Sequence, residues 1–335
     1  MTIKKIFIVL GLFTCFAHAE AKEEFFYKEL DLVGGYSDRD GWIAGKGMSH
    51  RTSAGFEYFR KFSNDYGDYM TIDLQARVSY NPREEFDEAW QAEIHNAWLD
   101  YKLGLGKSIR IGHFDPAFGL EPVIDTHGTL LQTLALKNIG FKKDWGIEYR
   151  GMAGAFDYEV AYSIGSGMGV ERMDSSYLIT GRVGSRTGGG LEYGLSGMYG
   201  DVLKSGKAAT FPRPEYEEEA VHKKRVGLDL RQDLGRCGIM GEIAFGQDDK
   251  EEVVGCMTEI DYTVPSLQAL VLKMQWQLWA NNIGRADAID NTINLGASYS
   301  LTRDITLRLA YFHDLQRFNG DEDRMVLLQL YFYGF

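Results

Sequence analysis

The sequence predicts an all-β fold, a transmembrane antiparallel β-barrel of sixteen strands, and three observations support this prediction. Apolar and polar side chains alternate along most of the chain, which is the side-chain period of a strand. Glycine and aromatic residues are abundant, with 39 Gly, 19 Tyr and 19 Phe, whereas proline is scarce, with 6 residues. Mean hydropathy is −0.26, and beyond the N-terminal segment no apolar run is long enough for a membrane helix. Strands that face lipid and water in turn have these features.

The alternation is clearest in three segments. In residues 290–301, DNTINLGASYSL, the side chains of Ile293, Leu295 and Ala297 share one parity, and Thr292 and Asn294 share the other. Residues 68–80, DYMTIDLQARVSY, and 156–164, FDYEVAYSI, show the same separation. Each segment therefore has one apolar and one polar face, as a strand between two environments requires.

Sixteen such segments can be counted along the chain. Their centres are Leu32, Phe56, Leu74, Leu99, Ile111, Ile147, Val160, Ile179, Leu195, Leu228, Ile243, Cys256, Leu272, Leu295, Leu309 and Gln329. The number is even, and short links such as 104–107 and 235–236 alternate with longer ones such as 119–143, as in single-chain outer-membrane barrels. The link DDKEE, between the eleventh and twelfth segments, is the exception because it is short where a long one is expected.

A secreted soluble β-sandwich or propeller is the alternative, since such folds also alternate. The aromatic residues favour the barrel. Tyr36, Tyr101, Tyr149, Tyr199 and Tyr299 fall on the apolar parity, several of them near strand ends, where the interfacial girdles of a membrane barrel lie.

The N-terminal residues predict export. Lys4 and Lys5 precede the apolar run from Ile6 to Phe13, and residues 17–19 form an A-x-A cleavage site. The run is too short for a membrane anchor, so we expect residues 1–19 to be a cleaved signal peptide and residues 20–335 to form a single barrel domain. The net charge of −12 argues against a nucleic-acid partner.

The C-terminal segment, MVLLQLYFYGF, is apolar to its last residue. If the sixteenth strand spans a bilayer, Phe335, Tyr333, Tyr331, Leu327 and Met325 are expected to face lipid at alternate positions. The opposite parity is also apolar, so we expect a non-aqueous neighbour inside. The pattern resembles the C-terminal signature of bacterial outer-membrane proteins, and this resemblance implies that Phe335, Tyr333 and Tyr331 are an assembly signal for the barrel-assembly machinery.

The link after the fifth segment is the longest and has an unusual apolar content. In residues 120–142, Leu130, Leu131 and Leu134 have the spacing of one helical face, which is unexpected in a loop exposed to the medium. We expect this third outer loop to fold inward and cover the apolar inner wall. A short helix that covers the barrel from outside is the alternative.

Residues 96–122, NAWLDYKLGLGKSIRIGHFDPAFGLEP, resemble a strand pair of the phosphate-selective porin O and P family. In that family an aromatic strand leads through a G-x-x-x-P-F-G-like turn into the third loop; here the turn is Gly112 to Gly119, with one extra residue between Pro116 and Phe118. The resemblance implies a sixteen-stranded porin in the bacterial outer membrane, in contact with its lipid and able to assemble as a homotrimer. It does not carry over anion selectivity.

The inward parity carries both signs of charge, with acids in a small majority. Arg77, Arg110, Arg150 and Arg182 lie on the third, fifth, sixth and eighth segments, and the third loop carries Glu121, Asp125 and His127. With Asp73, these residues are our candidate pore-lining and constriction set. A basic wall that faces an acidic loop would create a transverse field that orients polar solutes. The alternative for each arginine is an ion pair with a neighbouring acid within the wall.

The sequence contains no catalytic motif of the common hydrolase or nucleotide-binding types, and its histidines and cysteines have no metal-ligand spacing. We therefore expect no enzyme activity, no cofactor and no metal, and a channel for passive diffusion of small hydrophilic solutes or ions. Two alternatives remain. The barrel could be a structural sleeve for a multihaem cytochrome or an exported polymer, or a hydrolase with a site such as Ser49-His50 at the rim.

Overall fold

The computed structural model describes residues 21–46, 50–80, 89–124, 128–185, 190–203, 210, 219–320 and 322–335. The expected signal peptide, residues 1–19, lies outside this part of the chain, as do Ser49, Asp125 and His127.

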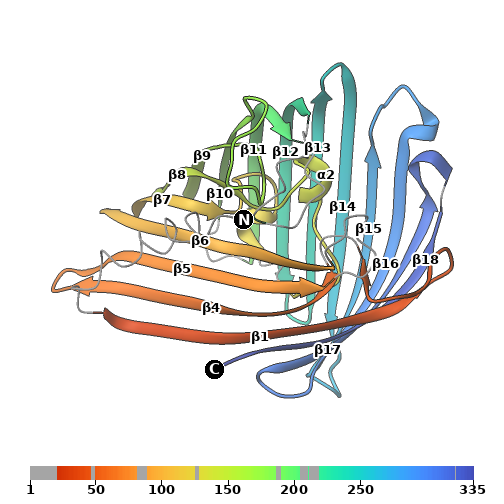
Figure 1. Ribbon diagram of the computed structural model, residues 1–335, viewed down its shortest axis with the longest axis horizontal. Coiled ribbons are helices and arrows are strands. Elements are labelled where there is room, and N and C mark those ends of the chain that lie inside the picture. Colours follow the sequence, from red (N-terminus) through yellow and green to blue (C-terminus); the bar gives the residue numbers. More distant parts are fainter. Residues whose placement is uncertain are drawn as a thin grey trace.

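The described chain forms one antiparallel sheet in which sixteen long strands close into a barrel (Figure 1). Each long strand pairs with its neighbours in the chain, and β1 closes the barrel by pairing with β18 as well as β4. The first eight are β1 (Ala21–Ser37), β4 (His50–Asn64), β5 (Gly67–Tyr80), β6 (Trp90–Gly104), β7 (Lys107–Phe114), β8 (Asp144–Ala153), β9 (Phe156–Ser163) and β10 (Tyr177–Ser185). The others are β11 (Leu191–Leu203), β12 (Ala220–Leu234), β13 (Cys237–Asp248), β14 (Glu251–Thr263), β15 (Leu270–Ala280), β16 (Ile289–Ser300), β17 (Ile305–Gln316) and β18 (Arg324–Gly334).

The predicted fold class is confirmed, because each of the sixteen predicted centres lies within a different long strand. Two short strands, β2 (Gly41–Ile43) and β3 (Gly45–Lys46), lie in the link between β1 and β4. The short link between β13 and β14 is a tight hairpin turn in which Asp249 has a φ of 51°. Aspartate tolerates this left-handed conformation, so the link that interrupts the predicted alternation needs no longer loop.

The two faces of the wall differ in polarity as predicted. On β16 and β9, Leu295 and Val160 face outward with exposed fractions of 46% and 53%, whereas the adjacent Asn294 and Glu159 face inward and are 4% and 5% exposed. The outer face thus presents aliphatic and aromatic side chains to its surroundings, and the inner face holds polar and charged ones. This is the reverse of a soluble domain and matches a membrane barrel.

The predicted orientation of β18 was wrong. Leu32 on β1 pairs with Leu330, and Val326, Leu328 and Leu330 are the exposed outward residues. The other parity faces inward; its members are Met325, Leu327, Gln329, Tyr331 and Tyr333, of which Leu327 is fully buried. Because both parities of this strand are apolar, alternation alone could not orient it. The apolar inner wall expected at this strand is present, but on the opposite set of side chains.

The helical elements are all short. They are η1 (Glu121–Val123) and α2 (Ala135–Asn138) in the link between β7 and β8, η2 (Ala286–Ala288) before β16, and η3 (Phe318–Gly320) before β18. No helix in the described residues is long and apolar enough to cross a membrane. The main clusters of buried apolar side chains lie where the β7–β8 link meets the inner wall.

Candidate functional site

The link between β7 and β8, here called the crossing loop (residues 115–143), runs through the inside of the barrel. Near its start, Gly119 N donates to Ser196 Oγ on β11 at 3.1 Å, and Leu120 N donates to the Glu242 carboxylate on β13 at 2.9 Å. Gly119 has a φ of +61°, and a Cβ atom built there would lie 2.5 Å from the Glu242 carboxylate. Only glycine allows this close approach, so Gly119 determines where the loop contacts the wall.

The middle of the crossing loop reaches the opposite side of the barrel. Leu130 and Leu131 pack with Met325 and Leu327 of β18, and with Phe312 of β17. The ring of His50 on β4 holds this position, because its Nε2 lies 2.6 Å from the Leu130 carbonyl oxygen. The apolar residues that looked anomalous for an exposed loop are thus buried against the inner wall.

The end of the crossing loop returns to the wall from which it started. Asn138 Nδ2 of α2 donates to Glu242 Oε1 at 2.6 Å, and Lys223 Nζ on β12 donates to the Ile139 carbonyl at 2.7 Å. Ile139 and Phe141 pack with Leu178, Met198 and neighbouring wall residues. The loop is therefore held at several strands and narrows the lumen.

Beside the ion pair of Lys143 with Asp115 at 2.6 Å, the loop contains a second charged pair, Glu121 and Lys142. Their side chains are 4.0 Å apart, and Thr133 Oγ1 donates to Glu121 Oε2. Burial raises the pKa of Glu121 and lowers the pKa of Lys142, and each charge partly offsets the shift of the other. Glu121 thus interacts mainly within the loop.

Two of the four predicted arginines share a ladder of carboxylates on β6 to β9. Arg110 lies 3.5 Å from Asp100 and 3.7 Å from Glu148, both directly opposite it in the strand register. Arg150 contacts Asp100 at 3.6 Å and Glu159, its register partner, at 3.6 Å. Pairs of opposite charges on neighbouring strands stabilise the sheet.

Arg182 on β10 reaches over one strand to its partner. Its Nε and Nη2 donate to the two carboxylate oxygens of Asp229 on β12 at 3.0 and 2.6 Å. Gly194 on β11 lies between them, and its missing side chain leaves room for this contact. Both charged side chains are 2% exposed, so the pair is closed off from the lumen.

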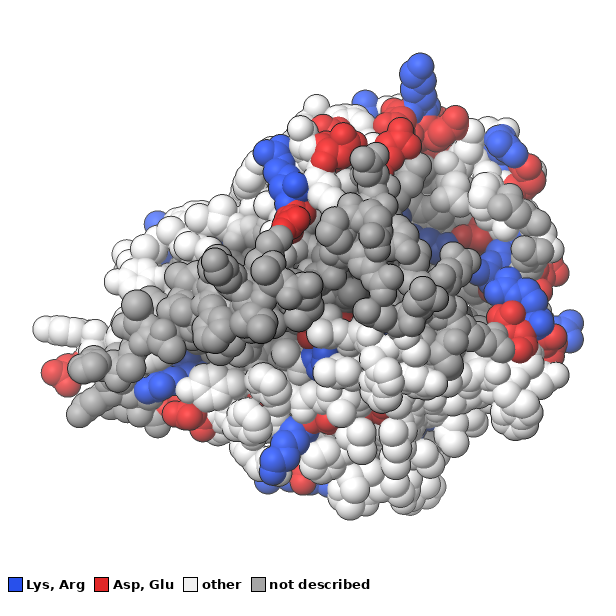
Figure 2. Space-filling model, in the orientation of Figure 1, with Lys and Arg blue, Asp and Glu red and all other residues white. Residues whose placement is uncertain are grey.

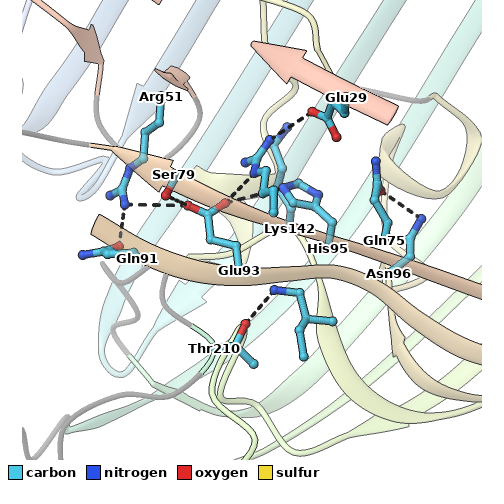
Figure 3. A network of polar contacts seen from close by, with 12 residues as sticks. Glu29, Arg51, Gln75, Ser79, Gln91, Glu93, His95, Asn96, Lys142 and Thr210 are labelled. Atoms are coloured by element: carbon cyan, nitrogen blue, oxygen red, sulfur yellow. Dashed lines mark hydrogen bonds and ion pairs between the residues drawn. The ribbon is translucent and has the colours of Figure 1, made fainter. Parts of the chain in front are cut away.

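Glu93 on β6 is at the centre of a network of polar contacts (Figure 3), and Arg77 is one of its partners. Arg77 Nε donates to Glu93 Oε2 at 2.7 Å, Ser79 Oγ donates to Glu93 Oε1, and Arg51 Nη1 lies 3.8 Å from the same oxygen. Glu29 on β1 lies 3.8 Å from Arg77, which links the network to the strand that closes the barrel. The Glu93 carboxylate therefore links side chains of β4 and β5 directly, and β1 through Arg77, on one side of the lumen.

The four arginines thus pair with acids within the wall, which is the alternative that the sequence left open. The described part of the crossing loop carries Lys137, Lys142 and Lys143 as well as Asp115 and Glu121, so it is not an acidic counterpart to a basic wall. In Figure 2, Lys and Arg side chains lie beside Asp and Glu side chains on the visible described surface. Asp73, the remaining candidate, accepts from Asn96 Nδ2 at 3.0 Å on β6.

A cluster of amides on β15 and β16 escaped the sequence analysis. Gln275 and Gln277 donate from Nε2 to the Gln132 carbonyl of the crossing loop at 3.1 and 2.6 Å. Asn294 Nδ2 donates to Gln275 Oε1 at 3.0 Å. These amides share the inward parity of the charged candidates, so the uncharged polar residues of that parity in the sequence are the signal for this cluster. Among the described residues, no group of three or more His, Cys, Asp or Glu side chains is placed to hold a metal ion.

Solved structures share this architecture over almost the whole chain. An anion-selective porin from Comamonas acidovorans matches with a TM-score of 0.65 and 13% identity, over 94% of this chain and 100% of that one. The fold is a porin barrel. The outer membrane channel DcaP of Acinetobacter baumannii matches with a TM-score of 0.61 and 13% identity over 93% and 97% of the two chains. OmpF of Salmonella typhi, in complex with daunomycin, matches with a TM-score of 0.62 and 10% identity over 92% and 97%. No protein-family model and no curated protein matches the sequence.

Proposed function

We propose that this porin barrel is an outer-membrane channel for passive diffusion of small hydrophilic solutes or ions. The observation that carries the proposal is the inverted polarity of a closed wall: exposed residues such as Leu295 and Val160 face outward, and buried polar residues such as Asn294 and Glu159 face the lumen. A barrel of sixteen strands is wide enough for an aqueous lumen, and the crossing loop narrows it.

The same polarity supports a place in the outer membrane of a bacterial cell, with residues 1–19 removed on export and residues 20–335 forming the barrel. A homotrimer is supported by the OmpT structure of Vibrio cholerae, a trimer form that matches this chain with a TM-score of 0.63 and 13% identity. We propose that Phe335, Tyr333 and Tyr331 are read by the barrel-assembly machinery. Because Tyr331 and Tyr333 face the lumen in the folded barrel, the machinery would recognise them before β18 pairs with β1.

We propose weak ion selectivity that leans towards cations. Arg77, Arg110 and Arg150 line the wall but are matched by acids at their own register positions, and Arg182 is matched by Asp229 two strands away. The four arginines therefore leave little net field for anions. The local resemblance of residues 96–122 to phosphate-selective porins supports the channel and assigns no phosphate preference. A phosphate channel would need rows of cations without acid partners.

The two alternative functions are less well supported. The crossing loop binds β11, β13, β15 and β18 from inside and so occupies the space that a cytochrome or a polymer would need. A rim hydrolase would need His50 as a base, but its Nε2 is engaged by the Leu130 carbonyl and its side chain is 4% exposed. We therefore propose that the chain is not an enzyme.

Swelling of liposomes that contain the refolded protein tests the proposal. We expect swelling in solutions of monosaccharides and amino acids, slower swelling for disaccharides, and none for large dextrans, because the narrowed lumen admits solutes by size. Liposomes with heat-unfolded protein are the control. Absence of swelling for every solute would overturn the channel, and entry of dextrans would overturn the narrowing by the crossing loop.

A further inference from the structure

A cavity of about 290 Å³ lies between the crossing loop and the wall of β15 to β17. Leu130 and Leu134 of the loop and Phe312 of β17 give it an apolar side. Gln277 of β15 and Thr292 and Asn294 of β16 give it a polar side made of amides and a hydroxyl. A solute that fits must therefore present hydrogen-bonding groups on one side and carbon–hydrogen surface on the other.

Asn294 lines this cavity, and a chain of amides fixes the orientation of its side chain and leaves its buried Oδ1 without a donor. Gln275 Nε2 donates to Glu259 Oε2 at 2.6 Å, which leaves Gln275 Oε1 to accept from Asn294 Nδ2 at 3.0 Å. The amide of Asn294 cannot flip without losing that bond, so its Oδ1 is the atom left for a ligand. Asn294 is 4% exposed, and no described protein group donates to this Oδ1.

Thr292 repeats the arrangement one position along the same face of β16. Its Oγ1 is buried and has no hydrogen-bond partner among the described residues, and the residue lines the same cavity. A buried polar atom without a partner costs about 1–3 kcal/mol, so two of them side by side in one cavity mark a place where a ligand gains by donating hydrogen bonds.

The charges around the cavity are balanced in pairs. Lys137 of α2 pairs with Asp290 at the start of β16, and Arg317 pairs with Asp314 at 3.0 Å. A charged solute would have to break one of these pairs before it gained a partner of its own. An uncharged solute with several hydroxyl groups meets no such cost, because amides and hydroxyls bond it directly.

The crossing loop also borders a second cavity beside the first. The second cavity, of about 220 Å³, shares Gln132, Thr133 and Gln275 with the first. Gln132 lies at the border of the two spaces, and among the described residues its carbonyl oxygen accepts from the side-chain amides of Gln275 and Gln277. Hydroxyl groups of a passing solute can replace these amides one at a time.

We propose that the first cavity is a binding subsite for a small uncharged polyhydroxyl solute of monosaccharide size, with Asn294 and Thr292 as acceptors of its hydroxyl groups. The subsite rests on the proposed channel function and deepens it, because it names a solute class for which passage past the loop is favourable. A pyranose ring has the required two-sided character, with hydroxyls at its edge and C–H groups on its faces.

Calorimetric titration of the refolded protein in detergent with glucose, glucuronate and glucosamine tests the subsite, since these pyranoses share a size and differ in charge. We expect saturable binding of glucose and much weaker binding of the two charged probes. Thr292→Val and Asn294→Leu should each weaken glucose binding about two- to tenfold, the effect of one hydrogen bond. Thr71→Val, on the inner face of β5, is the matched control and should bind glucose as the wild type does.

The outcomes separate the subsite from the channel. Heat-modifiable mobility in gels shows whether each variant is folded, and Thr292→Val keeps the side-chain shape. No saturable glucose binding, equal binding of glucuronate, or unchanged binding by both variants would overturn the subsite, whatever the liposomes show. Saturable binding lost in the variants supports it even if the liposomes fail to swell, and that failure would overturn the channel instead.

Discussion

Arg182 and Asp229 form a bidentate ion pair across β11, with N–O distances of 3.0 and 2.6 Å. Asp229→Asn leaves the guanidinium buried beside a neutral amide, so the free energy of unfolding should fall by about 3–5 kcal/mol, as for a broken buried pair. Urea unfolding in detergent, followed by tryptophan fluorescence, measures the change. Asp233→Asn on the same strand is the control, because its pair with Arg231 is exposed and should cost less than about 1 kcal/mol. Equal losses in the two variants would contradict the bridge.

A side chain at Gly194 should disturb the ion pair between Arg182 and Asp229. A Cβ atom at this position would lie 2.3 Å from Arg182 Nη2 and 2.5 Å from the Asp229 carboxylate. Gly194→Ala should therefore lower the unfolding free energy by about 1–3 kcal/mol. Gly197→Ala on the same strand is the matched control, because the nearest atom to its Cβ is 3.8 Å away. A Gly194→Ala barrel as stable as Gly197→Ala would show that the bridge does not need the gap.

The orientation of β18 predicts which of its residues face lipid. A bimane label on Leu328→Cys should be quenched by brominated lipids, whereas the same label on Gln329→Cys should not, because Leu328 faces outward and Gln329 donates inward to Asp31 Oδ2 at 2.9 Å. Cys237 and Cys256 are replaced by serine in both variants. Quenching at Gln329→Cys alone would instead show that the odd-numbered residues of β18 face lipid, as the sequence pattern predicted.

Asp323 joins the first and last outer links and gives the barrel a pH dependence. Burial alone would raise the pKa of Asp323, but hydrogen bonds from Ser37 Oγ at 2.6 Å, from Arg39 N at 3.2 Å and from Arg324 N lower it below the usual 3.8. The ionised carboxylate is favoured in the folded state, so its stabilisation is fully present well above the unfolded-state pKa of 3.8 and is lost as the pH falls through the lower folded-state pKa.

Thermal unfolding of the wild type and Asp323→Asn from pH 3 to pH 7 measures this contribution. The wild type should be more stable by about 1–3 kcal/mol at pH 5 to 7, and the difference should become smaller as the pH falls towards 3. Asp287→Asn, in the exposed link before β16, is the control and should follow the wild type closely. A difference between the wild type and Asp323→Asn that does not change with pH would exclude the carboxylate as its source.

Alternation predicted the strands because each pairs a lipid-facing parity with a polar one, as in Leu295 and Asn294. It failed at β18, where Leu327 and Leu328 are equally apolar and only the register with β1 decides which of them faces inward. The inward course of the crossing loop could be expected from Leu130 and Leu131. The partners of the arginines could not, since the pairing of Arg182 with Asp229 depends on a strand register and on the gap at Gly194.

Single-channel conductance in planar bilayers tests the central claim most directly, with the wild type compared with Leu131→Asp. Leu131 is 5% exposed against the apolar wall of β18, so a carboxylate there should release the crossing loop and leave the barrel wall intact. The account predicts stepwise ohmic currents for the wild type and larger steps for the variant. Silent bilayers, or steps of the same size for both proteins, would contradict a water-filled lumen narrowed by this loop.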